Sequence, residues 1–168
     1  MVSSIVIYMD TDKNLKGYTL IELLVVITIS TIIFGVGIAG YREFSRRQAL
    51  TGVLKQVKAD LRLAQQLALT GQKPEGQICN SLDGYTFTRT SGSVYTLTAN
   101  CINPSANYVI KTINMPTNIT ISGSPVNTVK FKILGQGTSL SASLTFTIAN
   151  TTAGTSGTVI VGTGGDVN

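Results

Sequence analysis

The residue of this chain whose position most suggests chemistry is a lone carboxylate in an apolar run. Glu22 is the only charged residue between Leu20 and Ala39. A carboxylate in the first turn of a membrane-spanning helix costs roughly a few kcal/mol unless it reaches the interface or finds a cation. Gly17 and Tyr18 stand just ahead of it, at the junction between a polar segment and the apolar run. Glu22 therefore either pairs with a cation or extends to the lipid headgroups.

The composition excludes most catalytic chemistry. The 168 residues include no His, no Trp and only eight acidic residues, so the commonest general base and the usual metal ligand are missing. Four of the later acids show no motif spacing: Asp60, Glu75, Asp83 and Asp166. No candidate base accompanies the many Ser and Thr residues. We expect neither an enzyme nor a metal or other cofactor.

Two cysteines, Cys79 and Cys101, lie outside the apolar run. An even number of cysteines in a chain that leaves the cytoplasm favours a disulfide. This disulfide would close a loop of about 22 residues and contribute roughly 3 kcal/mol to stability. The alternative is a pair of unbonded buried thiols, since two Cys without His leave a tetrahedral metal site half empty.

The residues from Leu20 to Ala39 predict a membrane-spanning helix. At about 1.5 Å per residue this stretch reaches roughly 30 Å, the thickness of a hydrocarbon core. A polar segment, Met9 to Gly17, precedes it, and a basic segment with Arg42, Arg46 and Arg47 follows it. A secretory signal peptide would have a shorter apolar core followed by a small-residue cleavage site, whereas here the apolar run continues into an amphipathic segment.

The amphipathic segment shows helical periodicity over about five turns. Its apolar positions are Leu50, Leu54, Val57, Leu61, Ala64 and Ala68, and its opposite face carries Lys55, Lys58, Arg62, Gln65 and Gln66. No Pro or Gly interrupts Val53 to Thr70, and Gly71 with Pro74 forms a helix stop. The sequence thus predicts one helix from about Tyr18 to Thr70.

The second half of the chain is typical of short antiparallel strands. Alternating β-branched and aromatic residues occur at Tyr85–Arg89, Val94–Thr98, Tyr108–Ile113, Ile119–Ile121, Val129–Ile133, Leu144–Ile148 and Thr158–Val161. We assign Tyr85, Phe87 and Tyr95 to the core rather than to a ligand platform. The predicted fold is α+β: a long N-terminal helix, membrane-spanning in its first half and amphipathic in its second, packs against a C-terminal β-rich antiparallel head through a sheet on the apolar stripe.

The segment Lys16-Gly17-Tyr18-Thr19-Leu20-Ile21-Glu22-Leu23 resembles the cleavage site of type IV prepilins and pseudopilins. In that family a Gly precedes the cut, an aromatic residue becomes the new N-terminus and a Glu follows four residues later. The resemblance covers about 25 residues. A weaker resemblance, to the GspH/FimT type of minor pseudopilin, rests on the helix ending in Leu61–Gln66, the β-rich head and a glycine-containing C-terminal strand.

The resemblance implies a processing site and an assembly residue. A membrane aspartyl peptidase would cut between Gly17 and Tyr18 and commonly methylate the new Tyr18 amine. Glu22 would pair with the N-terminal amine of a neighbouring subunit, and no catalytic residue is expected. The domains would be a leader at 1–17, a transmembrane and filament-core half-helix at 18–40, an amphipathic half-helix at 41–71 and a β-rich globular head at 72–168.

Three features depart from the family pattern or leave alternatives open. The helix-kinking Pro of major pilins is missing, and Gly35, Gly37 and Gly40 either soften the same region or allow close helix packing. Met9 is a second candidate start, which would leave a leader of about nine residues. The positive-inside rule would place the basic residues from Arg42 onward in the cytoplasm, which is the reverse of the family orientation. We follow the motif, with the leader cytoplasmic and the head periplasmic or extracellular.

The basic character of the chain does not by itself indicate nucleic-acid binding. The sequence pI is about 9.4, and residues 40–70 hold six basic and two acidic residues, while residues 71–168 hold five and three. No basic residue follows Lys132, so the C-terminal loops cannot offer an arginine clamp for phosphate. Direct nucleic-acid binding is therefore not expected, and the basic helix face is assigned to anionic lipid or to a filament contact.

The function predicted from these residues is that of a structural subunit. It would be a minor pilin or pseudopilin of a type IV pilus, a type II secretion system or a competence system. Its partners would be a prepilin peptidase, other pilins or pseudopilins and the lipid of the inner or plasma membrane. The alternatives are a membrane-anchored binding module, such as an adhesin or DNA-uptake receptor, and, with the least support, a membrane-anchored enzyme.

Overall fold

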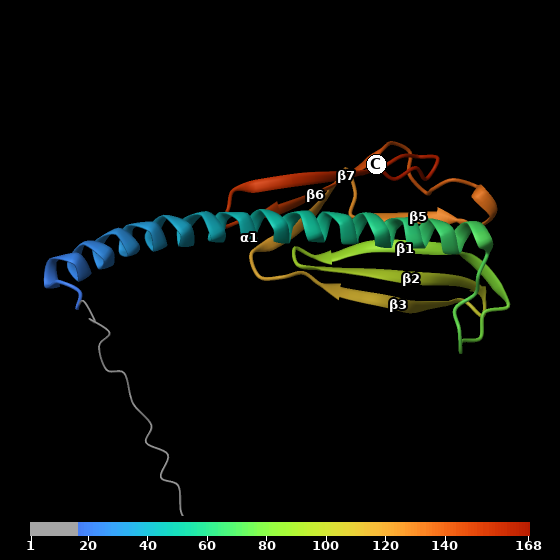
Figure 1. The fold of residues 1–168 in the computed structure, drawn as a ribbon. Coiled ribbons are helices and arrows are strands. Elements are labelled where there is room, and N and C mark those ends of the chain that lie inside the picture. Colours follow the sequence, from blue (N-terminus) through green and yellow to red (C-terminus); the bar gives the residue numbers. More distant parts are fainter. Residues whose placement is uncertain (1–16) are drawn as a thin grey trace, which may run out of the picture. The chain divides into compact units, whose positions relative to one another are not determined.

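A computed structural model describes residues 17–168 (Figure 1). The described residues divide into two compact units, 17–40 and Tyr41–Asn168. The predicted leader up to Lys16, including the alternative start Met9, lies outside the described residues.

One helix, α1, covers Leu20–Thr70, two residues later than the predicted start at Tyr18. The Thr19 hydroxyl accepts a hydrogen bond from the Glu22 backbone N–H at 3.3 Å, so Thr19 caps the first turn. At the other end Gly71 has a φ of +63°, and the N–H groups of Gly71 and Gln72 donate to the carbonyls of Ala68 and Leu67. This pair of bonds is a Schellman motif, which confirms the predicted stop at Gly71.

In the first unit, the apolar side chains of α1 are exposed. They include Leu20, Ile33 and Phe34. By length and composition, α1 is the helix among the described residues that could cross a membrane. A surface this apolar requires lipid or the helices of other chains around it.

All seven predicted strands are present. They are β1 (Ser81–Ser91), β2 (Val94–Asn103), β3 (Ala106–Asn114), β4 (Ile119–Ser124), β5 (Thr128–Lys132), β6 (Leu144–Asn150) and β7 (Thr155–Val161), with a short 3₁₀ turn, η1 (Ile133–Gly135), after β5. The predicted antiparallel head is confirmed, and its strands form two antiparallel sheets, ordered β3-β2-β1-β5 and β4-β6-β7. Strand β4 pairs with β6 rather than with either of its neighbours in sequence, and local patterning carries no information on that choice.

The second half of α1 packs on both sheets (Figure 1). Its buried hydrophobic residues are Leu50, Val53, Val57, Leu61, Ala64 and Ala68. Two sheets require a wider apolar stripe than one. Val53, which the predicted stripe omitted, is therefore buried. Leu54, which the predicted stripe included, is only partly buried. Leu54 lies against Gly157 of β7, because a Cβ atom added to Gly157 would overlap the Leu54 side chain.

Aromatic residues connect the two sheets in the core. The rings of Phe87 and Tyr95 stack with centroids 4.7 Å apart, and Phe87 meets Phe146 of the second sheet edge-on at 5.1 Å. Tyr85, Phe87 and Tyr95 are each at most 1% exposed. Their assignment to the core is confirmed.

The predicted cysteine pair forms a disulfide. Cys79 in the loop after α1 is bonded to Cys101 in β2, with Cα atoms 5.6 Å apart. The bond ties the loop between α1 and β1 to the four-stranded sheet, and both residues are buried.

A buried carboxylate, Asp60, fastens α1 to the four-stranded sheet. Asp60 is 4% exposed. It accepts hydrogen bonds from the Tyr95 hydroxyl and from Lys111 Nζ, both at 2.7 Å. Burial, together with the hydrogen bond to Asp60 and its negative charge, raises the pKa of Tyr95 well above its usual value.

A β-bulge makes the contact with Lys111 possible. The register of β2 and β3 shifts between Leu97 and Thr98, so that Ile110 is an extra residue on β3. Val109 and Ile110 are therefore both exposed, and Lys111 returns to the side of the sheet that faces α1.

We predict that Tyr95 makes the fold sensitive to alkali. Because its pKa is raised on folding, its contribution is complete below the unfolded pKa of about 10 and is lost as the pH rises above that value. Tyr95→Phe removes a hydrogen bond to a buried charge and should lower the free energy of unfolding by roughly 1.5–3 kcal/mol at neutral pH. The variant should also lose less stability than wild type between about pH 9 and 11.

Thermal unfolding of the full chain in detergent measures both effects. Tyr41→Phe, which changes an exposed tyrosine, is the control. Since Lys111 is present in every protein compared, the difference between wild type and Tyr95→Phe isolates the hydroxyl. An alkaline loss of the same size in both would contradict the role assigned to Tyr95.

We also predict that Gly84 in β1 tolerates no side chain. Its φ is +154°, and a Cβ atom there would overlap the backbone carbonyl oxygen of Phe131 in β5. Gly84→Ala should therefore cost on the order of 2–4 kcal/mol by straining or separating β1 and β5. Gly92→Ala, where a Cβ meets nothing within 4 Å, should leave the thermal midpoint nearly unchanged. Equal midpoints for the two variants would show that the contact at Gly84 relaxes freely.

Candidate functional site

The residues of the predicted processing site lie at the start of α1. Gly17, Tyr18 and Thr19 are not helical, and α1 begins at Leu20. Tyr18 is 83% exposed, and a Cβ atom added to Gly17 would meet nothing within 4 Å. The peptide bond between Gly17 and Tyr18 therefore belongs to an open stretch of backbone that is free of helical hydrogen bonds.

Glu22 lies in the first turn of α1, where the helix dipole favours a negative charge. Together with Tyr18, Leu23 and Val26 it lines a cavity of about 330 Å³. Glu22 and Val26 are four residues apart and therefore share one side of the helix, and Tyr18 lies just before its first residue. The arrangement places one carboxylate beside an apolar hollow, where it could accept an ammonium group.

The predicted site residues fall into two groups. Gly17, Tyr18 and Glu22 lie together in six consecutive residues and belong to the first unit. Cys79 and Cys101 belong to the second unit, where they bond to each other. The buried hydrophobic residues of the described chain begin at Leu50, so the N-terminal group takes no part in that core.

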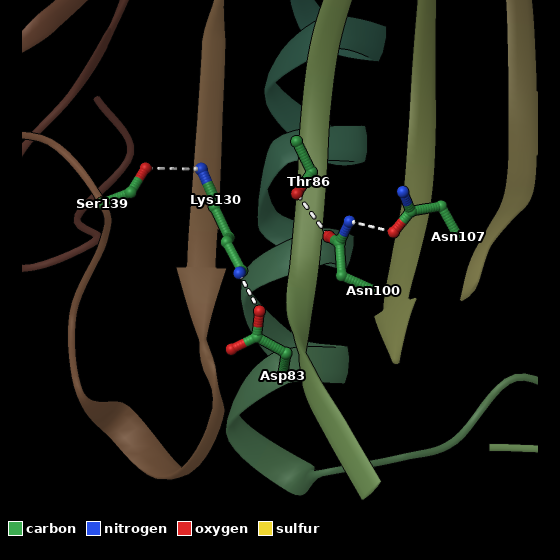
Figure 2. Close-up of polar contacts among 6 residues, drawn as sticks. All are labelled: Asp83, Thr86, Asn100, Asn107, Lys130 and Ser139. Atoms are coloured by element: carbon green, nitrogen blue, oxygen red, sulfur yellow. Dashed lines mark hydrogen bonds and ion pairs between the residues drawn. The ribbon is translucent and has the colours of Figure 1, made fainter. Parts of the chain in front are cut away.

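A polar row crosses the face of the four-stranded sheet opposite α1 (Figure 2). The Thr86 hydroxyl donates to the side-chain oxygen of Asn100, whose amide donates to Asn107 at 2.8 Å, so β1, β2 and β3 are linked side by side. On β5, Lys130 Nζ pairs with Asp83 of β1, and its backbone N–H donates to Ser139 at 3.2 Å. The side chains in this row bond to one another, which supports a role in holding the strand register rather than in binding a ligand.

Sequence reasoning missed this row and the role of Asp60. Asp60 was treated as an acid without motif spacing, although it lies three residues after Val57 and directly before Leu61, on the buried side of the helix. That position was the available signal. For the polar row there was none, because the contacts depend on strand pairing.

A groove of about 520 Å³ lies between the loop after α1 and β3. Two tyrosine hydroxyls in its wall are bonded to backbone carbonyls: Tyr85 donates to Gln72 at 2.7 Å and Tyr108 donates to Ile78 at 3.1 Å. Burial raises the pKa of Tyr85, so its hydroxyl stays protonated near neutral pH. Within residues 17–168 there is no group of three or more His, Cys, Asp or Glu side chains that could hold a metal ion.

Comparison with known proteins identifies the N-terminal motif. Residues 12–38 match the family model of the prokaryotic N-terminal methylation motif. No curated protein sequence matches the chain.

Two solved structures share the fold. Both are crystal structures of the type IV minor pilin FimU of Pseudomonas aeruginosa, in space groups P21 and P65. The first is 13% identical, with a TM-score of 0.55 over 74% of this chain and 90% of FimU. The second is 12% identical, with a TM-score of 0.52 over 71% and 90%. The chain thus carries a prokaryotic N-terminal methylation motif, and its fold is similar to that of a type IV minor pilin.

Proposed function

We propose that this protein is an assembly subunit without catalysis of its own: a minor pilin or pseudopilin of a type IV pilus, a type II secretion system or a competence system. The observation that carries the proposal is the methylation motif at residues 12–38 at the start of a chain with a minor-pilin fold. The finer assignment to the GspH/FimT type stays a prediction from the sequence.

Processing by a prepilin peptidase is part of the proposal. A peptidase binds its substrate as extended backbone, so a helix that contained the scissile bond would first have to unwind. The bond between Gly17 and Tyr18 precedes the Thr19 cap and is open. Cleavage there would make Tyr18 the N-terminus and leave its amine, commonly methylated in this family, close in sequence to Glu22.

Glu22 is the proposed assembly residue. An unpaired carboxylate in an apolar environment is costly, and a docked ammonium group compensates it. The cavity beside Glu22 has the open, largely apolar surroundings that such a pair needs. We propose that the N-terminal amine of a neighbouring subunit is the partner, in preference to an interaction of Glu22 with lipid headgroups.

The proposed location is the membrane, with the leader in the cytoplasm and the head outside. The apolar first part of α1 is long enough to be the anchor. The disulfide between Cys79 and Cys101 fits an oxidising compartment for the head. The alternative function, a binding module, could have used Tyr85, Phe87 and Tyr95 as an aromatic surface for a ligand. These three side chains are buried, so they do not support it.

We predict cleavage between Gly17 and Tyr18. In membranes that contain an active prepilin peptidase, mass spectrometry of the N-terminal peptide should show a mature chain that begins at Tyr18 with a methylated amine. Gly17→Ala should slow the cut, because a side chain is added next to the scissile bond. Gly35→Ala, further along α1, should be processed as wild type. A mature chain that still begins at Met1 or Met9 would rule out the prepilin assignment.

We predict that Glu22 matters for assembly and not for folding of the head. Glu22→Gln should insert into membranes at least as well as wild type, because a costly charge is removed. Loss of the ion pair should lower its co-purification with other pilin-like subunits about tenfold or more. Glu43→Gln, which removes the exposed acid paired with Arg47 at 2.9 Å, is the control. Wild-type co-purification of Glu22→Gln would leave Glu22 as a headgroup-facing residue.

A further inference from the structure

The second half of α1 has an exposed face opposite its buried stripe. Six residues of that face, Lys55, Lys58, Ala59, Arg62, Leu63 and Gln66, line a groove of about 500 Å³, which we call the cationic groove. Its three cations follow at intervals of three and four residues and therefore lie along one side of the helix. Lys55 and Arg62 are exposed and Lys58 is partly so.

The positive charge of the cationic groove is not balanced within α1. The two acids of α1 in the second unit are Glu43, which pairs with Arg47, and Asp60, which is turned into the core toward Tyr95 and Lys111. The third ion pair found among residues 17–168 joins Lys130 to Asp83 on the sheet. The contact described for Arg62 is a hydrogen bond to the Val167 carbonyl at 3.3 Å, which leaves its charge uncompensated.

The groove also has an apolar seam. Ala59 and Leu63 line the groove four residues apart, and Gly52 lies outside it, seven residues before Ala59 along α1. These intervals of seven and four residues are the spacing of a helix-pairing seam. Leu63 is 38% exposed, and a Cβ atom at Gly52 would meet nothing within 4 Å. Small residues here allow another helix to approach closely, and the flanking cations occupy the positions that select a partner by charge.

We propose that the cationic groove is the docking site for a helix of a different pilin-like subunit, one that carries Asp or Glu beside a small apolar seam. This proposal rests on the proposed function and names the chemistry of the partner. It predicts a mixed assembly, in which this chain is recognised by a subunit of opposite charge.

A second copy of the chain does not supply this chemistry. Outside the three ion pairs, the acids described in the second unit are Glu75, in the loop after α1, and Asp166, which accepts a hydrogen bond from Asn168 at 3.2 Å near the C-terminus. They stand singly on loops and cannot form a helical acidic row against three cations.

Lipid and nucleic acid fit the groove less well than a helix does. A phosphate backbone has no apolar counterpart for Ala59 and Leu63. Lys55 lies 14 residues beyond Tyr41, about 21 Å along the helix from the start of the second unit, whereas lipid surface charge acts over about 8 Å at physiological salt. Arg42 and Arg46, nearer the apolar segment, are the better lipid contacts.

The test is photo-cross-linking in membranes that process and assemble the full chain. A photoreactive residue replaces Ala59, and the control replaces Thr90, which is exposed on β1. We expect the Ala59 position to cross-link to a different pilin-like subunit, at a helical peptide rich in Asp or Glu. Lys55→Glu with Lys58→Glu should lower the yield at least fivefold, and changing the identified acids to Lys should restore it. Lys132→Glu, an exposed lysine of β5, should have no effect.

Other results would overturn the proposal: a cross-link to a second copy, to phospholipid or to nucleic acid, no product, or a yield that does not change with charge. If charge reversal lowers the thermal midpoint, Lys55→Gln with Lys58→Gln replaces it. The N-terminal peptide separates the two proposals. A chain that is cut after Gly17 but gives none of the expected cross-link refutes the docking site alone, whereas an uncut chain refutes the proposed function.

Discussion

The burial of one stripe of α1 against two sheets is the contact on which the second unit depends. Val57, Leu61 and Ala64 are fully buried, and they belong to one hydrophobic core with residues of both sheets. Phe87 and Phe146 then connect the sheets directly. Each sheet has an apolar face that must be covered by another element, so the helix is what allows the two sheets to form one core.

Apolar burial is not directional, so a polar contact has to select the position of α1 on the sheet. Asp60 provides it, because its carboxylate is satisfied only where the Tyr95 hydroxyl and Lys111 Nζ both reach it. A buried charge without these partners would cost several kcal/mol, on the order of 3–5 for a broken pair. The bulge at Ile110 is part of the same arrangement, since it turns Lys111 toward the helix and leaves two apolar residues exposed.

The same helix thus serves three different environments. Its first residues present an open peptide bond and a carboxylate beside an apolar hollow. One side of its second half is buried in the core, and Asp60, the acid on that side, is paired with Lys111. The residues that line the groove on the opposite side include three cations and no acid, and this asymmetry gives α1 a face for a partner of opposite charge.

The sequence by itself determined the features that depend on neighbours along the chain. These are the apolar span, the helix end at Gly71, the seven strands, the N-terminal motif with Glu22 and the pairing of the only two cysteines, because periodicity, turn residues and cysteine count are all visible in one dimension. Tertiary structure alone decided the division into two sheets, the contact of Asp60 with Lys111 and the row from Thr86 to Asn107. Each of these requires strand order and register between segments far apart in sequence. A shift of one residue would turn every side chain to the opposite face, and only the packing of the whole core selects the register.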